Sequence, residues 1–137
     1  RAPGGRAPTC LSWLFGRKCE RERSALVEEA RGAAFPDAVF LIHHCNTDTR
    51  RWWSDPKPPE ITPDEVFGTF DRRAYAEALE KVRKMRSDAS YTGMAYHNYA
   101  QVTHSFARAR KLLRRENPGF SERSYELATD AAITDMR

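Results

Sequence analysis

The sequence predicts an α/β fold: a strand–helix–strand core with a small mixed sheet, followed by a C-terminal helical extension. Two short apolar runs, residues 11–15 and 38–42, have the length of strands rather than helices. The segment between them, residues 20–31, has the apolar spacing of a helix. A strand, a helix and a second strand in this order indicate a βαβ unit with a parallel strand pair.

The first half of this core follows a flexible N-terminal segment, residues 1–10, in which glycine and proline are frequent. Residues 11–15 read LSWLF and predict the first strand. In the following helix Leu26, Val27 and Ala30 share one face, and Gly32 provides a stop. Pro36 and Asp37 then predict a turn into residues 38–42, which are apolar on both faces and predict a central strand.

The second half of the core begins with a proline-rich loop, residues 46–63, around Trp52 and Trp53. Two adjacent tryptophans in such a loop favour a role at an interface. Residues 65–70 predict an edge strand. Asp71 is placed to cap a helix that runs to about Arg86, with Phe70 and Tyr75 at the hydrophobic-staple positions. The α/β domain therefore spans residues 11–86.

Residues 87–137 form the predicted helical extension. One helix has a narrow apolar seam and ends at the sequence Asn-Pro-Gly, residues 117–119. The seam consists of Tyr99, Val102, Phe106, Ala109 and Leu113. A last helix is predicted from Ser121 to about Met136. Because this much apolar surface favours a partner, we include Tyr99 and Phe106 among the predicted interface residues.

Composition narrows the functional classes. The 137 residues carry 23 Lys and Arg against 19 Asp and Glu, and this net charge of +4 excludes a strongly acidic disordered chain. No apolar run approaches the roughly 20 residues that a membrane crossing requires. Three cysteines exclude a complete disulfide framework. Four basic and no acidic residues between Arg1 and Lys18 favour an organellar targeting segment, with an unstructured tail as the alternative.

Cysteines in this pattern suggest two kinds of chemistry, a zinc site and a redox centre. A zinc site would need Cys10, Cys19, Cys45 and one of the adjacent histidines, His43 or His44. The eight-residue spacing of the first two cysteines does not suit a zinc knuckle, so we predict no metal. Cys19 begins the first helix as a redox cysteine does, but no second cysteine lies two residues away. We therefore predict no catalytic residue and no cofactor.

A basic run ends the helix of the extension. Five of the eight residues from 108 to 115 are cationic: Arg108, Arg110, Lys111, Arg114 and Arg115. Such a run suits RNA phosphates, an acidic protein surface or anionic lipid headgroups, and a solvated helix face is the structural alternative.

Residues 35–84 resemble the thioredoxin-like domain of a small accessory subunit of mitochondrial respiratory complex I (NADH:ubiquinone oxidoreductase). A related domain occurs in some mitochondrial ribosomal proteins. The resemblance is carried by Pro36-Asp37, the sequence VFLIHHC ending at Cys45, Trp53, and the sequence ALEKV ending at Val82.

The resemblance implies a thioredoxin-like, non-catalytic subunit on the matrix side of the inner membrane, docked on other subunits of complex I without a small-molecule substrate. A mitochondrial ribosomal protein, which would contact RNA, is the first alternative, and a thiol-disulfide oxidoreductase is the second. In a thioredoxin-like domain Cys19 and Cys45 lie near each other, so they are expected to be structural thiols.

Overall fold

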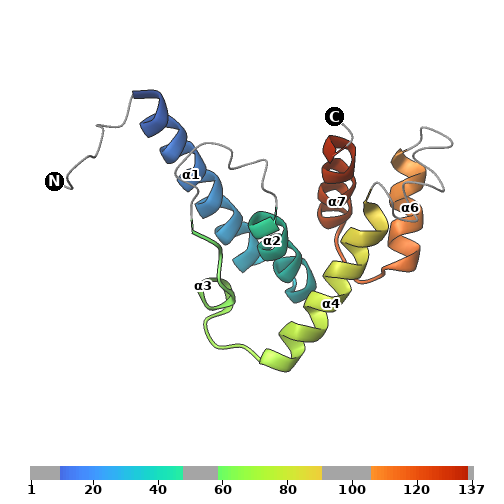
Figure 1. Ribbon diagram of the computed structural model, residues 1–137. Coiled ribbons are helices and arrows are strands. Elements are labelled where there is room, and N and C mark those ends of the chain that lie inside the picture. The colour runs from blue at the N-terminus through green and yellow to red at the C-terminus, as the bar shows by residue number, and fades with distance from the viewer. Residues whose placement is uncertain (1–9, 48–58, 91–105, 136–137) are drawn as a thin grey trace.

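The computed structural model describes residues 10–47, 59–90 and 106–135, and every regular element in these ranges is a helix (Figure 1). In chain order the helices are α1 (Cys10–Gly32), α2 (Phe35–Thr47), α3 (Pro63–Phe67), α4 (Arg72–Ala89), α6 (Phe106–Glu116) and α7 (Glu122–Asp135). No strand occurs in these ranges.

The predicted α/β fold with a thioredoxin-like βαβ core and a mixed sheet is therefore wrong. Residues 11–15, the expected first strand, belong to α1, and residues 38–42, the expected central strand, belong to α2. The expected edge strand at residues 65–70 starts as the end of α3 and continues as a bend. With the sheet, the fold implied by the resemblance is also lost.

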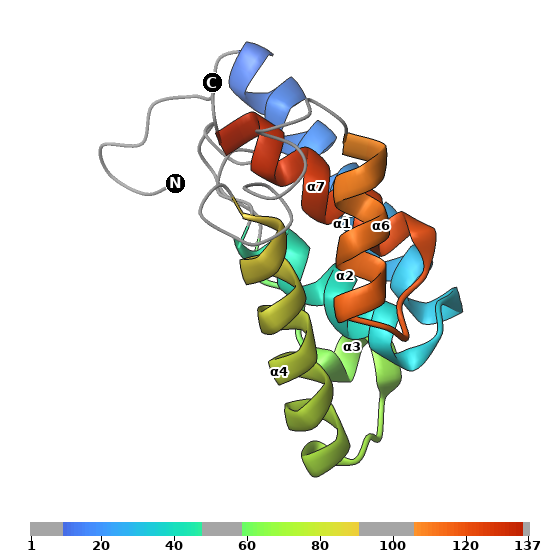
Figure 2. The ribbon, with the colours of Figure 1, turned by 90° about the vertical axis from the view of Figure 1, so that its right-hand side faces the viewer.

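The central position of α2 in the bundle explains why the strand predicted at residues 38–42 is wrong. Helix α2 packs against α1, α3, α4 and α7, and Figures 1 and 2 show it enclosed by them. Ala38, Val39 and Phe40 have no exposed surface. An apolar run that is buried on every side looks the same in a central strand and in a central helix. Pro36 and Asp37, interpreted as a turn, lie in the first turn of α2, where proline and acidic side chains are favoured.

Other elements are as predicted. The helix at residues 20–31 is part of α1, which ends at Gly32. Asp71 caps α4 by accepting hydrogen bonds from the backbone N–H groups of Arg73 and Ala74. The rings of Phe70 and Tyr75 lie 5.5 Å apart, in the predicted staple. The last predicted helix is α7.

Two arginines of α1 hold the segment around α3. Arg23 donates to the backbone oxygens of Pro59 and Glu60 and to both carboxylate oxygens of Glu65, at 2.7–3.0 Å. Arg31 donates twice to the backbone oxygen of Glu65. The hydrogen bonds from the Thr62 backbone and from Arg23 lower the pKa of the Glu65 carboxyl below its usual value.

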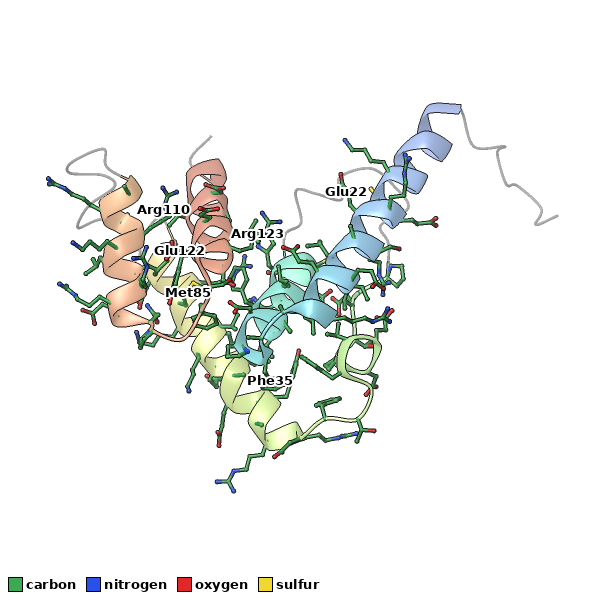
Figure 3. The ribbon with its side chains drawn as sticks, turned by 180° about the vertical axis from the view of Figure 1, so that it is seen from behind. Glu22, Phe35, Met85, Arg110, Glu122 and Arg123 are labelled. Carbon is green, nitrogen blue, oxygen red and sulfur yellow. The ribbon has the colours of Figure 1, made fainter. Side chains whose placement is uncertain are left out.

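The start of α7 is held by a carboxylate from α2. Asp37 is buried, and its Oδ1 accepts from the backbone N–H of Ser121 at 2.8 Å and from the hydroxyl of Ser124 at 2.7 Å. On the outer side, Arg123 of α7 forms an ion pair with Glu29 of α1 at 2.9 Å. Figure 3 shows Arg123 directed from α7 toward α1.

Asn117 ties the end of α6 to α4 and α7. Its amide donates to Asp88 at 2.9 Å, and its Oδ1 accepts from Lys84 at 3.1 Å. Its backbone oxygen accepts from the hydroxyl of Tyr125 at 2.7 Å. Ala109 and Leu113 of α6 and Tyr125 of α7 belong to the same buried cluster as α2, so residues beyond 87 contribute to this core. None of the helices in the described ranges has the length and apolar character needed to cross a bilayer.

We predict that Asp37→Ala lowers the free energy of unfolding by about 1–3 kcal/mol, because the substitution leaves two donors at the start of α7 without their acceptor. Urea denaturation of the full chain measures this change. Asp64→Ala in the exposed first turn of α3 is the matched control and stays within about 0.5 kcal/mol of the wild type. Equal stability of the two variants would contradict the bridging role of Asp37.

Candidate functional site

The candidate site is a groove on the outer face of α6. Ala109 and Leu113 face the core, which leaves four of the five cationic side chains of the same helix exposed to solvent. Residues 108, 111 and 115 share one face, because side chains three, four and seven positions apart line up along a helix. An open groove of about 690 Å³ lies along this face. It is lined by Arg108, Lys111, Leu112, Arg114, Arg115 and Pro118.

The groove combines an apolar floor with a cationic rim. Leu112 is almost fully buried beneath the groove, and exposed Pro118 supplies apolar surface between the charges. The side chains of Lys111 and Arg115 are exposed, and so are those of Arg108 and Arg114. The groove therefore offers both apolar contact and charge to a ligand.

The carboxylate of Glu122 lies beside the groove and is paired with Arg114. Arg114 contacts both carboxylate oxygens of Glu122, at the start of α7. Its Nε lies 2.7 Å from one oxygen, and a terminal guanidinium nitrogen donates to the other at 3.0 Å. This two-pronged contact is the preferred geometry between arginine and a carboxylate. The Arg114 guanidinium also lies 6.0 Å from the ring centre of Tyr125. Arg115 forms a looser pair with Glu116, at 3.4 Å.

The structure brings together four of the five predicted basic residues: Arg108, Lys111, Arg114 and Arg115. Arg110, labelled in Figure 3, is half-buried and does not line the groove. Phe106 is the first residue of α6. The remaining predicted interface residues, Trp52, Trp53 and Tyr99, lie outside the described residues.

Sequence reasoning missed the apolar part of the groove. Leu112 lies beside the predicted seam residue Leu113, and the sequence predicts only that Pro118 ends the helix. The signal for Leu112 is its spacing, since it is four residues after Arg108 and therefore on the same face. Pro118 carries no comparable signal, because its position depends on how Asn117 ends α6.

The predicted structural thiols are Cys19 of α1 and Cys45 of α2. Both are buried in the same core. A thiol must reach its partner disulfide to exchange with it, so this burial argues against the oxidoreductase alternative. Among the described residues, no three side chains of the metal-binding types are grouped to hold an ion.

Two histidines of α2 face α4. His44 is buried, its ring stacks on Phe40 at 5.6 Å, and its Nδ1 lies 3.0 Å from the Arg86 guanidinium. Since arginine only donates, that nitrogen is an acceptor and His44 carries its proton on Nε2. Within the described part of the chain, the buried Nδ1 of His43 has no hydrogen-bond partner. Burial, and then the charges of Arg86 and Arg83, lower the pKa of His43 to about 4.

Comparison with known proteins finds no match for this chain: no family model, no curated protein and no solved structure is similar to it.

We predict that His43 makes the protein less stable as the pH falls from about 6.5 to about 4. In this range the unfolded chain binds a proton on His43 that the folded chain excludes, so protonation favours unfolding. His43→Phe keeps a ring and removes the titrating group. Urea denaturation at a series of pH values should show that the free energy of unfolding falls less steeply for the variant than for the wild type over this range. If the free energy of unfolding depends on pH in the same way in both proteins, His43 is not the group that causes the loss of stability.

We also predict that Cys19 and Cys45 are shielded from solvent in the folded state. The test uses Cys10→Ser, which leaves these two thiols alone, and follows their alkylation by a maleimide. The reaction should be roughly a hundredfold slower in buffer than in denaturant, because it waits for the core to open. Labelling at similar rates in both conditions would contradict the burial of the thiols.

Proposed function

We propose that the chain is a non-catalytic accessory subunit that docks on a larger assembly through the basic groove of α6. The observation that carries this proposal is the convergence of four cationic side chains on one groove with an apolar floor. Interfaces that combine apolar contact with arginine are typical of stable protein association.

The groove is more than an incidental solvated helix face. A solvated face needs no apolar floor, yet Leu112 and Pro118 lie between the charges. Arg114 and Arg115 do favour the last turn of α6 through the helix dipole, which accounts for part of the basic run. Lys111 lies earlier in α6 and gains less from that effect, so its place in the groove supports a ligand.

The resemblance to a subunit of respiratory complex I implied a thioredoxin-like sheet, and the helical fold takes that support away. Assignment to complex I, or to the mitochondrial ribosome as the alternative, stays a prediction, as does the mitochondrial location. The docking role depends only on the groove and does not require either assignment.

We predict that the wild-type chain, tagged and expressed in its source cells, co-sediments with a large assembly. Lys111→Glu combined with Arg115→Glu reverses two exposed charges of the groove and should move most of the chain to the free fraction. Arg72→Glu combined with Arg73→Glu makes the same charge change in the exposed first turn of α4 and should leave sedimentation unchanged.

Assays of the gradient fractions for NADH dehydrogenase activity and for ribosomal RNA identify the assembly. A wild-type chain that sediments alone, or a groove variant that sediments as the wild type does, would contradict the proposed function.

A further inference from the structure

We propose that the first two turns of α1, residues 10–16, bind the surface of an anionic lipid membrane. Their apolar side chains enter the boundary between headgroups and acyl chains, and the cations that follow them contact the headgroup phosphates. Figure 1 shows this end of α1 on the opposite side of the molecule from α6. The inference therefore goes beyond the proposed docking function and does not depend on the groove.

Helix α1 is longer than α2, against which it packs. Its 23 residues rise about 35 Å along the axis, whereas the 13 residues of α2 rise about 20 Å. Figures 1 and 3 show the start of α1 extending past α2 and away from the other helices. Among the side chains of α1 whose burial the structure describes, the first buried one is Cys19. The first two turns therefore project from the bundle, where a flat surface can reach them.

The apolar residues of these turns begin a row that is exposed further along the helix. Leu11 and Leu14 start the row, because positions three and four apart align on a helix. The row continues at Lys18, Arg21 and Ala25, and all three of these side chains are exposed. Positions 11 and 14 therefore lie on the side of α1 that faces away from the core.

The core-facing row of α1 takes a different path. It passes through the buried Cys19 and Leu26, and seven positions before Cys19 it reaches Ser12. At 3.6 residues per turn, Leu11 and Leu14 lie about 100° and about 160° around the axis from Ser12. These two leucines do not continue the core face of the described helices, which suits them to an external apolar surface.

The charge of this part of the chain favours an anionic surface. Residues 1–19 contain four cations and no acidic residue. The cations are Arg1, Arg6, Arg17 and Lys18. Each Lys or Arg close to an anionic bilayer strengthens binding about fivefold. A protein partner would need a matching acidic patch, whereas a layer of anionic headgroups offers negative charge over its whole area. The membrane is therefore the better match.

The order of residue types along α1 matches the layers of a membrane surface. Leu11, Leu14 and Phe15 are typical of helices that bind at the interface, and tryptophan, here Trp13, concentrates at headgroup level. Arg17 lies about 9 Å further along the helix axis than Leu11. Interfacial helices bury their apolar side chains to a depth of about 5–10 Å, so the cations reach the headgroups when this end of α1 enters the bilayer.

The first test is sedimentation of the full chain with vesicles of phosphatidylcholine, alone or with about 30% phosphatidylglycerol. Binding to the anionic vesicles should be at least about tenfold tighter. Lys18→Glu combined with Arg21→Glu should weaken it about tenfold. Arg72→Glu combined with Arg73→Glu makes the same charge change on exposed residues of α4 and should weaken it less than about twofold.

The second test concerns the apolar row. Leu11→Ser combined with Leu14→Ser should weaken binding to the anionic vesicles at least about tenfold. The midpoint of urea denaturation should stay unchanged, because the row does not belong to the core.

The third test places a specific side chain in the lipid. The chain has three tryptophans, so Trp52→Phe combined with Trp53→Phe leaves only Trp13. Its fluorescence emission should shift to shorter wavelength when anionic vesicles are added, and lipids with brominated acyl chains should quench it.

Absence of vesicle binding, equal binding to both kinds of vesicle, or unchanged emission of Trp13 would overturn the inference. So would a leucine variant that binds as the wild type does, or an equal loss in the two charge variants. If Lys111→Glu combined with Arg115→Glu abolishes vesicle binding, the α6 groove is the lipid site and the inference is wrong. If the wild-type chain ignores vesicles but the leucine variant leaves its assembly, the row contacts protein, and the docking function stands without a membrane site.

Discussion

Phe40 and its neighbours Ala38 and Val39 have no exposed surface, so α2 must be enclosed on every side. One helix can cover only one face of another, and α2 therefore needs α1, α4 and α7 around it together. Two devices fix the covering helices in place: the carboxylate of Asp37, which holds the start of α7, and the arginines of α1, which hold the segment around α3. Enclosure of α2 is the constraint from which the remaining arrangement follows.

The same constraint determines where the groove lies. Since α7 is anchored on α2, Tyr125 reaches the end of α6, and its hydroxyl holds the backbone oxygen of Asn117. The Asn117 side chain then ties this end of α6 to α4. With Leu113 directed into the core, the helix has no freedom to turn its basic face inward. The positions of Lys111 and Arg115 on the surface are thus set by buried contacts a short distance away.

Local signals in the sequence were reliable, whereas the fold class was not. Asp71, Phe70 and Tyr75 were predicted correctly as a cap and staple, because these interactions depend on residues only a few positions apart. Residues 38–42 were assigned to a strand because burial on all sides removes the periodicity that identifies a helix. The basic part of the groove could be predicted from the helical spacing of the cations. The contributions of Pro118 and Asn117 could not, because they depend on tertiary contacts with α4 and α7.

The central claim is that the groove of α6 docks the chain on a protein of a larger assembly. Site-specific photo-crosslinking tests it most directly, with a crosslinking side chain at Lys111 in the full chain in its source cells and the same group at Arg72 for comparison. Mass spectrometry should identify, from Lys111 and not from Arg72, peptides of one partner protein. Crosslinks from Lys111 to RNA alone, or the same crosslinked proteins from Lys111 and from Arg72, would contradict the account.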